Sequence, residues 1–378
     1  MQTSNSNHQV RLSFVGDICL SGGLQNTLIT YGSSHPFKKI GNKLQKSDLV
    51  IGNLECCITE GEYDPNTPHN VMIVPENLAQ GLLDINLNVV SLANNHIMDA
   101  GTAGLISTQK FLERCGIDYF GAGLNIDFAE KPLIISRKST RFAFLGACDV
   151  PWVYASDNKA GAFPMLAKRM LKQIEEGKKL ADVIIFSIHA DLEFSPYPSP
   201  SRVKLSRWLV DNGADLVIQH HPHVCQGVEH YHNGLIAYSL GNFVFFVRGN
   251  TYFEEKSGTD WGIILHIDFD PASTTNRFAH SIVPVSINQD NATVASEGNA
   301  LDEQMSFLSF ISRQLENPRE IRRQRLMRCL KQVKSTFYTH YYLLRREGVV
   351  AMVTSGFKIL LSPYERRWML SLITLGVF

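Results

Sequence analysis

Several features that would define other protein classes are absent from this sequence. It has no run of about 18 consecutive apolar residues, so we expect no membrane-spanning helix. It also lacks internal repeats, low-complexity blocks and a GxGxxG pattern, which argues against disordered, repeat and dinucleotide-binding proteins. The seven cysteines are odd in number and include no CxxC pair, so a disulfide scaffold is not expected and a reducing compartment is favoured.

The first residues, Met1 to Gln9, are polar and lack the apolar stretch of a signal peptide. The chain has 378 residues, of which 44% are hydrophobic, enough to bury a sizeable core. These features predict a soluble, cytoplasmic, globular protein.

The formal net charge is zero, with 36 basic and 36 acidic residues, and this balance argues against nucleic acid as a partner. The total hides an asymmetry. After position 300 there are 13 basic and 6 acidic residues, which leaves 23 basic and 30 acidic residues in the first 300. The sequence therefore joins an acidic body, 1–300, to a basic extension, 301–378, and we expect these to be separate units.

Short apolar runs rich in β-branched residues alternate with helical patterns. The runs predict buried strands and are 10–15, 49–51, 89–93, 183–188, 216–219 and 235–240. Between them, helices are predicted from about Thr102 to Cys115, ending at Gly116, and from about Arg202 to Asn212, ending at Gly213. This alternation is typical of a layered α/β domain, in which polar residues at the carboxyl ends of strands meet in one crevice.

Three histidines follow two of these runs. His189 ends one run, and His221 and His223 form a His-x-His pair after the next. Such a pair can present two imidazoles to neighbouring metal ions. On their own, the histidines are equally compatible with polar loop positions or with hydrogen-bonded buried side chains.

Oxygen ligands are available at equivalent positions. Asp17, Glu55 and Asn95 each follow an apolar run, as the histidines do. A mixture of imidazole nitrogen and carboxylate or amide oxygen suits Mn, Fe, Ni or Zn better than calcium. The six residues together predict a site for one or two divalent ions.

Such a site supports hydrolysis of a phosphate ester by metal-activated water. His96, next to Asn95, is the candidate for the general acid that protonates the leaving oxygen, and Asp99 can orient it. The alternative for His96 is a helix-capping or loop role.

Five ordered motifs give the sequence a resemblance to a known family, the CapA family of bacterial capsule or poly-γ-glutamate synthesis proteins, relatives of the calcineurin-like metallophosphoesterases. The resemblance covers about residues 10–270. The motifs are Gly16-Asp17, Asn53-Leu54-Glu55, Ser91-Leu92-Ala93-Asn94-Asn95-His96 with Asp99 and Gly101, His220-His221-Pro222-His223-Val224 with Gln226, and Tyr238-Ser239-Leu240-Gly241-Asn242-Phe243.

This resemblance implies a four-layer α/β/β/α sandwich with metal at the strand ends. By motif, the implied catalytic acid is His96, and the implied metal ligands are Asp17, Glu55, Asn95, His189, His221 and His223.

The sequence departs from the superfamily pattern at four positions. Cys19 stands where Asp-x-His places a histidine, and Asn53 stands where the metal-bridging aspartate is usual. Asp191 follows His189 where relatives tend to have Trp-Gly, and its charge would either repel an anionic substrate or bind a metal. Gln219 replaces a common glycine, and the neighbouring His220 is expected to be a strand-end side chain that points away from His221.

The basic extension contains an amphipathic helical pattern around Pro318. Its positive residues are Arg313, Arg319, Arg322, Arg323, Arg325, Arg328, Lys331 and Lys334. This helix could lie on an anionic membrane surface or pack on the acidic body. The last apolar stretch, Trp368 to Phe378, is too short to span a membrane and is expected to dock on the domain or a partner.

The functional hypothesis from sequence is a metal-dependent phosphoesterase acting on an anionic small molecule or polymer, together with capsule-synthesis machinery. Two alternatives remain open: a non-hydrolytic polymer-binding or assembly component, and a γ-glutamyl amide hydrolase or transferase, because metal-bound hydroxide also attacks carbonyls.

Overall fold

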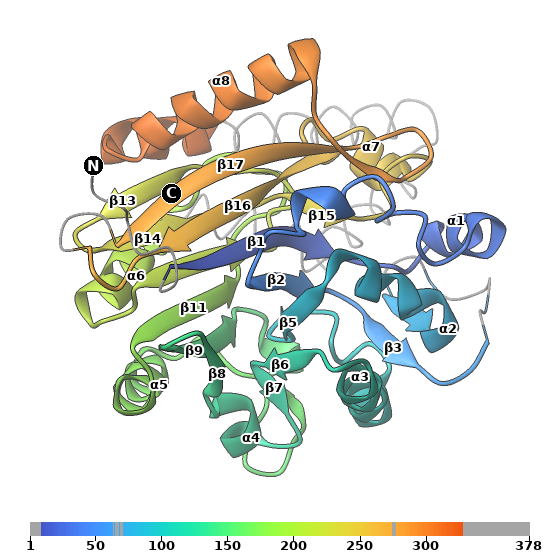
Figure 1. The fold of residues 1–378 in the computed structure, drawn as a ribbon, viewed down its shortest axis with the longest axis horizontal. Helices are drawn as coiled ribbons and strands as arrows, with labels where there is room; N and C mark the ends of the chain where they lie inside the picture. The colour runs from blue at the N-terminus through green and yellow to red at the C-terminus, as the bar shows by residue number, and fades with distance from the viewer. Residues whose placement is uncertain (1–8, 63, 65–67, 69–70, 274–276, 328–378) are drawn as a thin grey trace, which may run out of the picture.

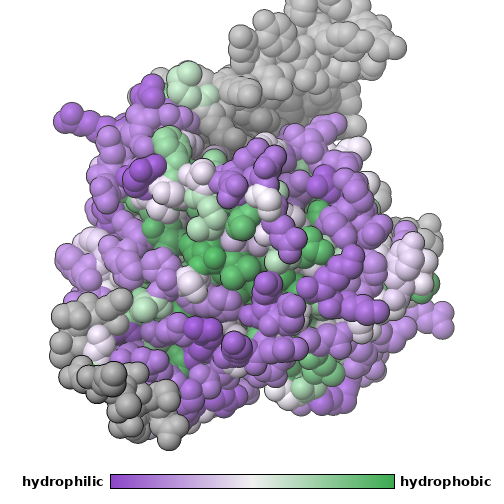
Figure 2. Space-filling model, turned by 45° about the horizontal axis from the view of Figure 1, so that its top comes forward, coloured by the Kyte–Doolittle hydropathy of each residue, from purple (hydrophilic) through white to green (hydrophobic). Residues whose placement is uncertain are grey.

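The computed structural model describes the chain except for residues 1–8, 63, 65–67, 69–70, 274–276 and 328–378. None of the helices in the described part combines the length and the hydropathy that a membrane crossing requires. The face shown in Figure 2 is mostly hydrophilic, with hydrophobic residues reaching the surface in a band across its centre.

The larger of two main sheets has the spatial order β18-β17-β16-β1-β2-β5-β6, and β15 also pairs with the end of β1 (Figure 1). Its strands are β1 Val10–Ile18, β2 Leu49–Leu54, β5 Leu87–Ser91, β6 Asp118–Phe120, β15 Asn242–Val244, β16 Trp261–Phe269, β17 Phe278–Ile287 and β18 Thr293–Ala295. β1, β2, β5 and β6 are parallel neighbours, whereas β16, β17 and β18 continue the sheet antiparallel.

The smaller main sheet has the order β13-β14-β12-β11-β9-β8. Its strands are β8 Leu133–Arg137, β9 Thr140–Cys148, β11 Val183–His189, β12 Leu216–His220, β13 Val228–Tyr231 and β14 Gly234–Ala237. The central strands β9, β11, β12 and β14 are parallel. Two strand pairs lie outside the main sheets, β3 Cys57–Thr59 with β4 Ile73–Pro75 and β7 Ala122–Gly123 with β10 Gly161–Ala162.

Helices connect the parallel strands. The α-helices are α1 Leu24–Tyr31, α2 Glu76–Ala79, α3 Gly101–Cys115, α4 Ile126–Glu130, α5 Ala167–Leu180, α6 Pro200–Asp211, α7 Thr251–Glu254 and α8 Gly298–Gln314. Short 3₁₀ turns are η1 Gly41–Lys43, η2 Gln80–Ile85 and η3 Pro151–Val153.

The two main sheets pack face to face. Phe14 of β1 and Ile51 of β2 meet Phe144 of β9 and Ile185 of β11 in one buried cluster. Because successive strand residues point to opposite faces, the neighbours Val15 and Val50 lie on the other side of the larger sheet. The cluster between the two sheets, which contains Phe14 and Phe144, forms the central layer of the core.

Helices cover the outer face of each sheet. On the larger sheet, Leu28 of α1 and Leu105 of α3 join the cluster of Val15 and Val50. On the smaller sheet, Ile174 of α5 and Leu209 of α6 pack in the same cluster as strand residues such as Phe186. The layers therefore run helix, sheet, sheet, helix, and the predicted α/β/β/α sandwich is confirmed.

The helix ends follow the capping signals in the sequence. α3 ends at Gly116, whose φ of 68° is the left-handed conformation that glycine adopts at low cost. α6 begins two residues before the predicted Arg202, because the Ser199 side chain accepts a hydrogen bond from the Arg202 N–H and Pro200 occupies the first turn.

Only the first part of the predicted strand 235–240 is a strand. β14 ends at Ala237 in the smaller sheet, and the chain then crosses to the larger sheet, where β15 begins at Asn242 beside β1. The apolar run extends past the end of β14 because Tyr238 and Leu240 of this crossing are also buried.

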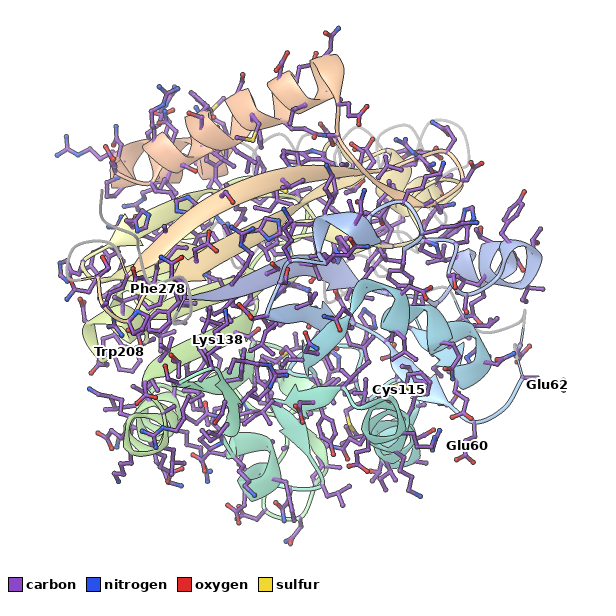
Figure 3. The ribbon with its side chains drawn as sticks, viewed as in Figure 1. Glu60, Glu62, Cys115, Lys138, Trp208 and Phe278 are labelled. Atoms are coloured by element: carbon purple, nitrogen blue, oxygen red, sulfur yellow. The ribbon has the colours of Figure 1, made fainter. Side chains whose placement is uncertain are left out.

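The described cysteines all have free thiols, and most are buried. Cys115, the last residue of α3, is the partly exposed one among them and packs against the cluster of Val15 and Val50. Figure 3 labels it together with Glu60 and Glu62, which lie at the edge of the molecule. Cys329 lies outside the described residues.

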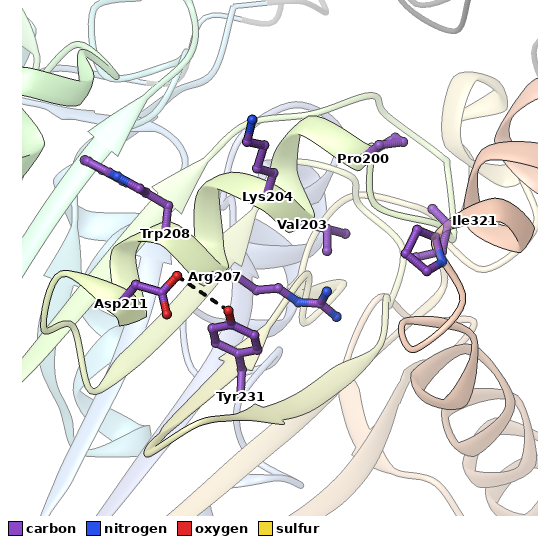
Figure 4. Close-up of a pocket in the computed structure, with 9 residues that line it drawn as sticks. Pro200, Val203, Lys204, Arg207, Trp208, Asp211, Tyr231 and Ile321 are labelled. Atoms are coloured by element: carbon purple, nitrogen blue, oxygen red, sulfur yellow. Dashed lines mark hydrogen bonds between the residues drawn. The ribbon is translucent and has the colours of Figure 1, made fainter.

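The described part of the basic extension packs on the body. α8 lies along β17 in Figure 1, and its buried Leu308 and Ile311 join the cluster between the sheets. A second helical segment begins at Pro318 and runs to Met327, where the described residues end. Figure 4 shows its Ile321 beside the first turns of α6, across a pocket that both elements line.

The positive residues of this extension have different environments. Arg325 is buried, whereas the exposed ones are Arg313, Arg319, Arg322 and Arg323. The remaining residues of the predicted amphipathic helix and of the apolar end lie outside the described residues, namely Arg328, Lys331, Lys334 and Trp368–Phe378. The domain boundary predicted at residue 300 falls in the first turn of α8, and the division there stays a prediction.

A close backbone approach at Gly16 generates a stability prediction. A Cβ at Gly16 would lie 2.1 Å from the carbonyl oxygen of Gly241, so Gly16→Ala must separate β1 from the chain crossing beside it. We expect a loss of about 3 kcal/mol in the free energy of unfolding, measured by chemical denaturation.

Gly298→Ala is the matched control, because a Cβ there meets nothing within 4 Å and only its φ of 55° is unfavourable. It should cost about 1 kcal/mol. Equal stabilities of the two variants would contradict the role given to the Gly16–Gly241 approach.

Candidate metal centre

The polar residues predicted from the strand ends meet where the two main sheets share an edge. Asp17, near the end of β1, is in register with Asn53 of β2, and Glu55 follows β2 directly. From the other sheet, His189 ends β11 in register with His220, the last residue of β12. Because β1 is parallel to β2 and β11 is parallel to β12, the carboxyl ends of each pair lie on one side of the sandwich.

Two adjoining groups of ligand atoms are formed there. Asp17, Glu55 and His189 offer atoms that all lie within 4.8 Å of one another, and so do Glu55, His221 and His223. All five residues are buried, and Glu55 belongs to both groups. The structure thus assembles five of the six predicted ligands into one compact cluster.

Glu55 provides the test of whether a cation fits. Its Oε1 atom is buried and accepts no hydrogen bond within the described chain. Two imidazole nitrogens nevertheless face it, His189 Nε2 at 3.4 Å and His223 Nε2 at 3.7 Å. A buried carboxylate oxygen without a donor is costly, and a divalent ion between these atoms would satisfy it. The residues present therefore fit a metal.

The sixth predicted ligand, Asn95, lies beside the cluster. Its Oδ1 atom is 2.6 Å from His189 Nε2. This is the same ring nitrogen that faces Glu55, so the amide oxygen of Asn95 approaches the candidate ligand atoms from the β5 side.

Asn53, the residue at the usual place of a bridging aspartate, acts as a hydrogen-bond donor. Its Nδ2 atom donates to Asp17 Oδ1 at 2.9 Å, and its Oδ1 atom accepts from Asn94 Nδ2 at 3.2 Å. Asn94 also donates to the Leu54 carbonyl. The amide thereby fixes the orientation of Asp17 without adding a negative charge to the cluster.

His220 takes part in the cluster, which the sequence did not indicate. It was expected to be a strand-end side chain without a role, but its Nδ1 atom lies 3.0 Å from Asp17 Oδ1. The sequence could not predict this contact, because the apolar pattern of β12 indicates only which face of its own sheet each side chain points to. Asp17 belongs to the other sheet. The sandwich implied by the family resemblance, with two sheets packed at this edge, could have suggested a role for His220.

Asn242 is a further residue to which no role was given. Its Oδ1 atom lies 3.0 Å from His223 Nδ1, and its Nδ2 atom donates to the Thr259 carbonyl. Because one ring nitrogen of His223 is engaged by this amide, the other is oriented toward Glu55. Asn242 was visible in the sequence only as part of a motif.

The turn after β12 has unusual backbone geometry. His221 has a φ of 97° and His223 a φ of 55°, values that side chains with a Cβ rarely adopt. Such conformations persist where surrounding contacts hold them, and they concentrate at functional sites. The turn brings the His221 ring to 4.7 Å from the His189 ring, measured between centroids.

The buried ionisable groups of the cluster shift one another's pKa values. Burial raises the pKa of Glu55 well above its ordinary value, and the nearby Asp17 charge raises it further. Burial alone would also raise the pKa of Asp17, but the hydrogen bond with His220 and the neighbouring histidines hold that pKa below its usual range. Burial lowers the pKa of His189 well below its ordinary value, so its ring is neutral and able to coordinate.

His96 and Asp99 form a separate pair next to this cluster. His96 Nδ1 lies 2.7 Å from Asp99 Oδ2, and 16% of each side chain is exposed. Asp99 also accepts a hydrogen bond from the Met72 N–H. Burial would lower the pKa of His96, but the hydrogen bond and the charge of Asp99 outweigh it and raise that pKa.

Two cysteines beside the site make thiol hydrogen bonds. Cys19 belongs to neither ligand group among the described residues, and its Sγ atom lies 3.2 Å from Ser21 Oγ. Burial raises the pKa of Cys57 to about 12, so it stays a thiol, and its Sγ donates to the carbonyls of His96 and Ile97.

The carboxylate of Asp191 already has a charged partner within the protein. It pairs with Arg325 of the basic extension, with Oδ1 2.6 Å from Nη2. The charge is therefore already balanced by the protein. Gln219 is also accounted for, because its Nε2 atom donates to Ser206 of α6.

Comparison with known proteins gives a family match. The model described as "Bacterial capsule synthesis protein PGA_cap" matches residues 11–246. The chain is 32% identical over 248 residues to the capsule biosynthesis protein CapA of Bacillus anthracis, covering 63% of this chain and 60% of that protein. It is 32% identical over 237 residues to the PGA biosynthesis protein CapA of Bacillus subtilis strain 168, covering 62% of each. The chain thus matches less than two thirds of the length of these relatives.

Solved structures with lower identity are also similar. A novel phosphatase from Mycoplasma pneumoniae has a TM-score of 0.46 and 13% identity, covering 74% of this chain and 94% of that one. A hypothetical protein from Thermus thermophilus has a TM-score of 0.45 and 14% identity, covering 76% of this chain and all of that one.

The shared position of Glu55 generates a binding prediction. Glu55→Gln keeps the side-chain shape but removes the charge that both ligand groups use. We expect the affinity for Mn²⁺ or Zn²⁺, measured by titration calorimetry, to fall at least about tenfold. Glu60→Gln, at an exposed position on the edge of the molecule, should leave it unchanged. Equal affinities in the two variants would exclude a metal site at Glu55.

Proposed function

The chain belongs to the PGA_cap family of bacterial capsule synthesis proteins, and on this premise we propose that it is a metal-dependent hydrolase of a phosphate ester. The observation that carries the proposal is the buried cluster around Glu55, in which two carboxylates and three imidazoles offer atoms within 4.8 Å in two adjoining groups. Mixed nitrogen and oxygen donors suit Mn, Fe, Ni or Zn.

The residues that would hold one or two ions are Asp17, Glu55, Asn95, His189, His221 and His223. When bound, a divalent ion supplies Lewis acidity toward an attacking water and toward the phosphoryl oxygens. The chain itself orients the ligands: Asn53 and His220 fix Asp17, and Asn242 fixes His223.

His96 would give a proton to the leaving oxygen. Asp99 engages Nδ1, which leaves Nε2 as the nitrogen that can exchange a proton with a substrate. The raised pKa keeps the ring protonated closer to neutral pH, as a general acid requires. Its partial exposure, next to Asn95 of the cluster, allows contact with a bound ester.

The charge balance favours an anionic substrate. The cluster contains the carboxylates of Asp17 and Glu55, and a single divalent ion would cancel both. An amide at Asn53 removes a third negative charge, and the carboxylate of Asp191 is balanced by Arg325. A phosphate group would therefore meet a neutral or positive site.

The names of the relatives, which are capsule and PGA biosynthesis proteins, support the biological setting that we propose. We place the phosphate ester in the production of a cell-surface polymer such as a capsule of poly-γ-glutamate or polysaccharide, with other components of capsule synthesis as partners.

Replacement of His96 by alanine tests the assignment. With metal content unchanged, His96→Ala should lower kcat for an aryl phosphate or phosphodiester by about 10²- to 10⁴-fold, because the leaving group loses its acid. His232→Ala, which removes an exposed histidine paired with Asp211, is the control and should retain full activity. Full turnover by the metal-loaded His96 variant would reject the general acid.

The same assay should include γ-glutamyl peptides. Turnover of these peptides without turnover of any phosphate ester would replace the phosphoesterase by an amide hydrolase. A metal-loaded protein that hydrolyses neither class would support a binding or assembly component instead.

Asp99 should set the pH range of activity. A general acid must be protonated, so kcat falls as the pH rises through its pKa. Because Asp99 raises the pKa of His96, Asp99→Asn should move this fall to lower pH. The measurement is the kcat–pH profile at saturating metal, with Asp268→Asn at the surface pair with Arg11 as the control. An unshifted profile would separate Asp99 from the reaction.

A further inference from the structure

The last described helical segment reaches the loop that follows His189. This loop, 190–199, connects β11 to α6. Arg325 Nη2 lies 2.6 Å from Asp191 Oδ1, and Nη1 donates to the Tyr197 carbonyl at 3.0 Å. The two charged side chains are almost completely buried, with 4% of Arg325 and 5% of Asp191 exposed. One guanidinium thereby contacts the loop near both of its ends.

Asp191 organises the loop from within. Its Oδ1 atom accepts the Leu192 N–H at 2.9 Å, and its Oδ2 atom accepts the Ser199 N–H at 2.7 Å. Asp191 itself has a φ of 94°, in the left-handed region that a residue with a Cβ adopts only when contacts hold it. The ion pair with Arg325 fixes the carboxylate that makes these bonds.

The loop is bonded in turn to the histidine turn of the metal centre. The Phe194 N–H donates to the Pro222 carbonyl at 2.7 Å, between His221 and His223. The Ala190 N–H donates to the His220 carbonyl at 3.1 Å. A displacement of the loop would therefore be transmitted to the turn that carries His221 and His223.

The ion pair also balances the negative charge of Asp191. Asp191 lies two residues from His189, and an unpaired buried carboxylate there would be costly and would repel an anionic substrate. Removing one partner of a buried pair leaves such a charge uncompensated. Lysine would keep the charge but lacks the planar fork that contacts Asp191 and Tyr197 together.

We propose that Arg325 is a positioning residue of the metal centre, which holds loop 190–199 and neutralises Asp191 beside the substrate site. This inference rests on the proposed function for its effect on catalysis. Arg325 lies beyond residues 11–246 that match the family model, so the basic extension contributes to the site of the matched domain. The extension up to Met327 is thus part of the functional unit.

The test compares Arg325→Met with Arg325→Lys, the double variant Arg325→Met with Asp191→Asn, and Arg323→Met. Arg323 is the matched control because it lies on the same segment and pairs with Glu320, but its side chain is 65% exposed. The readouts are hydrogen exchange of peptides covering 190–199 and 220–224, Mn²⁺ affinity by calorimetry, and KM and kcat for a phosphate ester.

Arg325→Met should speed exchange in both peptides, weaken Mn²⁺ binding about tenfold and raise KM by a similar factor. Arg325→Lys should be intermediate. In the double variant, Asp191→Asn restores the charge balance and should reverse most of the rise in KM. Exchange in the loop should stay fast, and a purely structural role for Arg325 would not separate these two effects. Arg323→Met should match the parent protein.

The proposal is overturned if Arg325→Met and Arg323→Met have the same hydrogen exchange and the same Mn²⁺ affinity. It is also overturned if adding Asp191→Asn to Arg325→Met does not bring KM back toward the value of the parent protein. Should Arg325→Met fail to fold, the lysine and double variants decide by the same criteria. Faster exchange and weaker Mn²⁺ binding in a protein that hydrolyses no phosphate ester would uphold Arg325 and reject the phosphoesterase. Exchange still decides the case if the parent protein binds no Mn²⁺.

Discussion

Two carboxylates, Asp17 and Glu55, are buried at the edge where two sheets meet, and the surrounding structure depends on compensating their charge. Burial of an unpaired carboxylate is expensive, so such groups must be hydrogen-bonded, protonated or bound to a cation. The protein supplies enough donors for Asp17 through Asn53 and His220. It leaves Glu55 Oε1 without a hydrogen bond from the described residues while two imidazoles face it. This unequal arrangement around two neighbouring carboxylates fits a cation at Glu55, which would take the place of the proton that the raised pKa of Glu55 otherwise favours.

The fold makes the cluster possible by converging strand ends from two sheets. Asp17 and Glu55 come from the larger sheet, whereas His189, His220 and the turn to His223 come from the smaller one. Gly16 permits the chain crossing at Gly241 to approach β1, which brings Asn242 beside His223. The energy for this arrangement comes from the apolar layers, since the left-handed residues His221 and His223 are unfavourable by themselves.

The sequence alone predicted the strands that carry the candidate site, the helices that end at Gly116 and Gly213, and most of the ligand cluster, because these depend on local patterns. It did not predict other elements such as β9, β16 and α5. Buried parallel strands appear as continuous apolar runs, and each predicted ligand lies within a few residues of the end of one. What local patterns could not predict were contacts between sheets. His220 was given no role because its partner Asp17 belongs to the other sheet, and Asp191 could not be interpreted because its partner Arg325 is 134 positions away. The identity of Asn242 as the orienting residue for His223 depended on the same convergence. The catalytic and metal roles themselves stay predictions until the variants are measured.

The acidic body and the basic extension meet in one buried ion pair, between Asp191 and Arg325. The acidic body places Asp191 next to a site that we assign to an anionic substrate, and the basic extension supplies Arg325 to balance it. A lysine or arginine on the exposed face of the same segment could not do this, since solvent screens it and Arg323 already pairs with Glu320. Of the described arginines of the extension, the one that enters the body is the one whose burial is compensated by a carboxylate and a carbonyl. If Arg325 positions the loop as we propose, a partner that moves this segment would act on the candidate metal centre through Asp191.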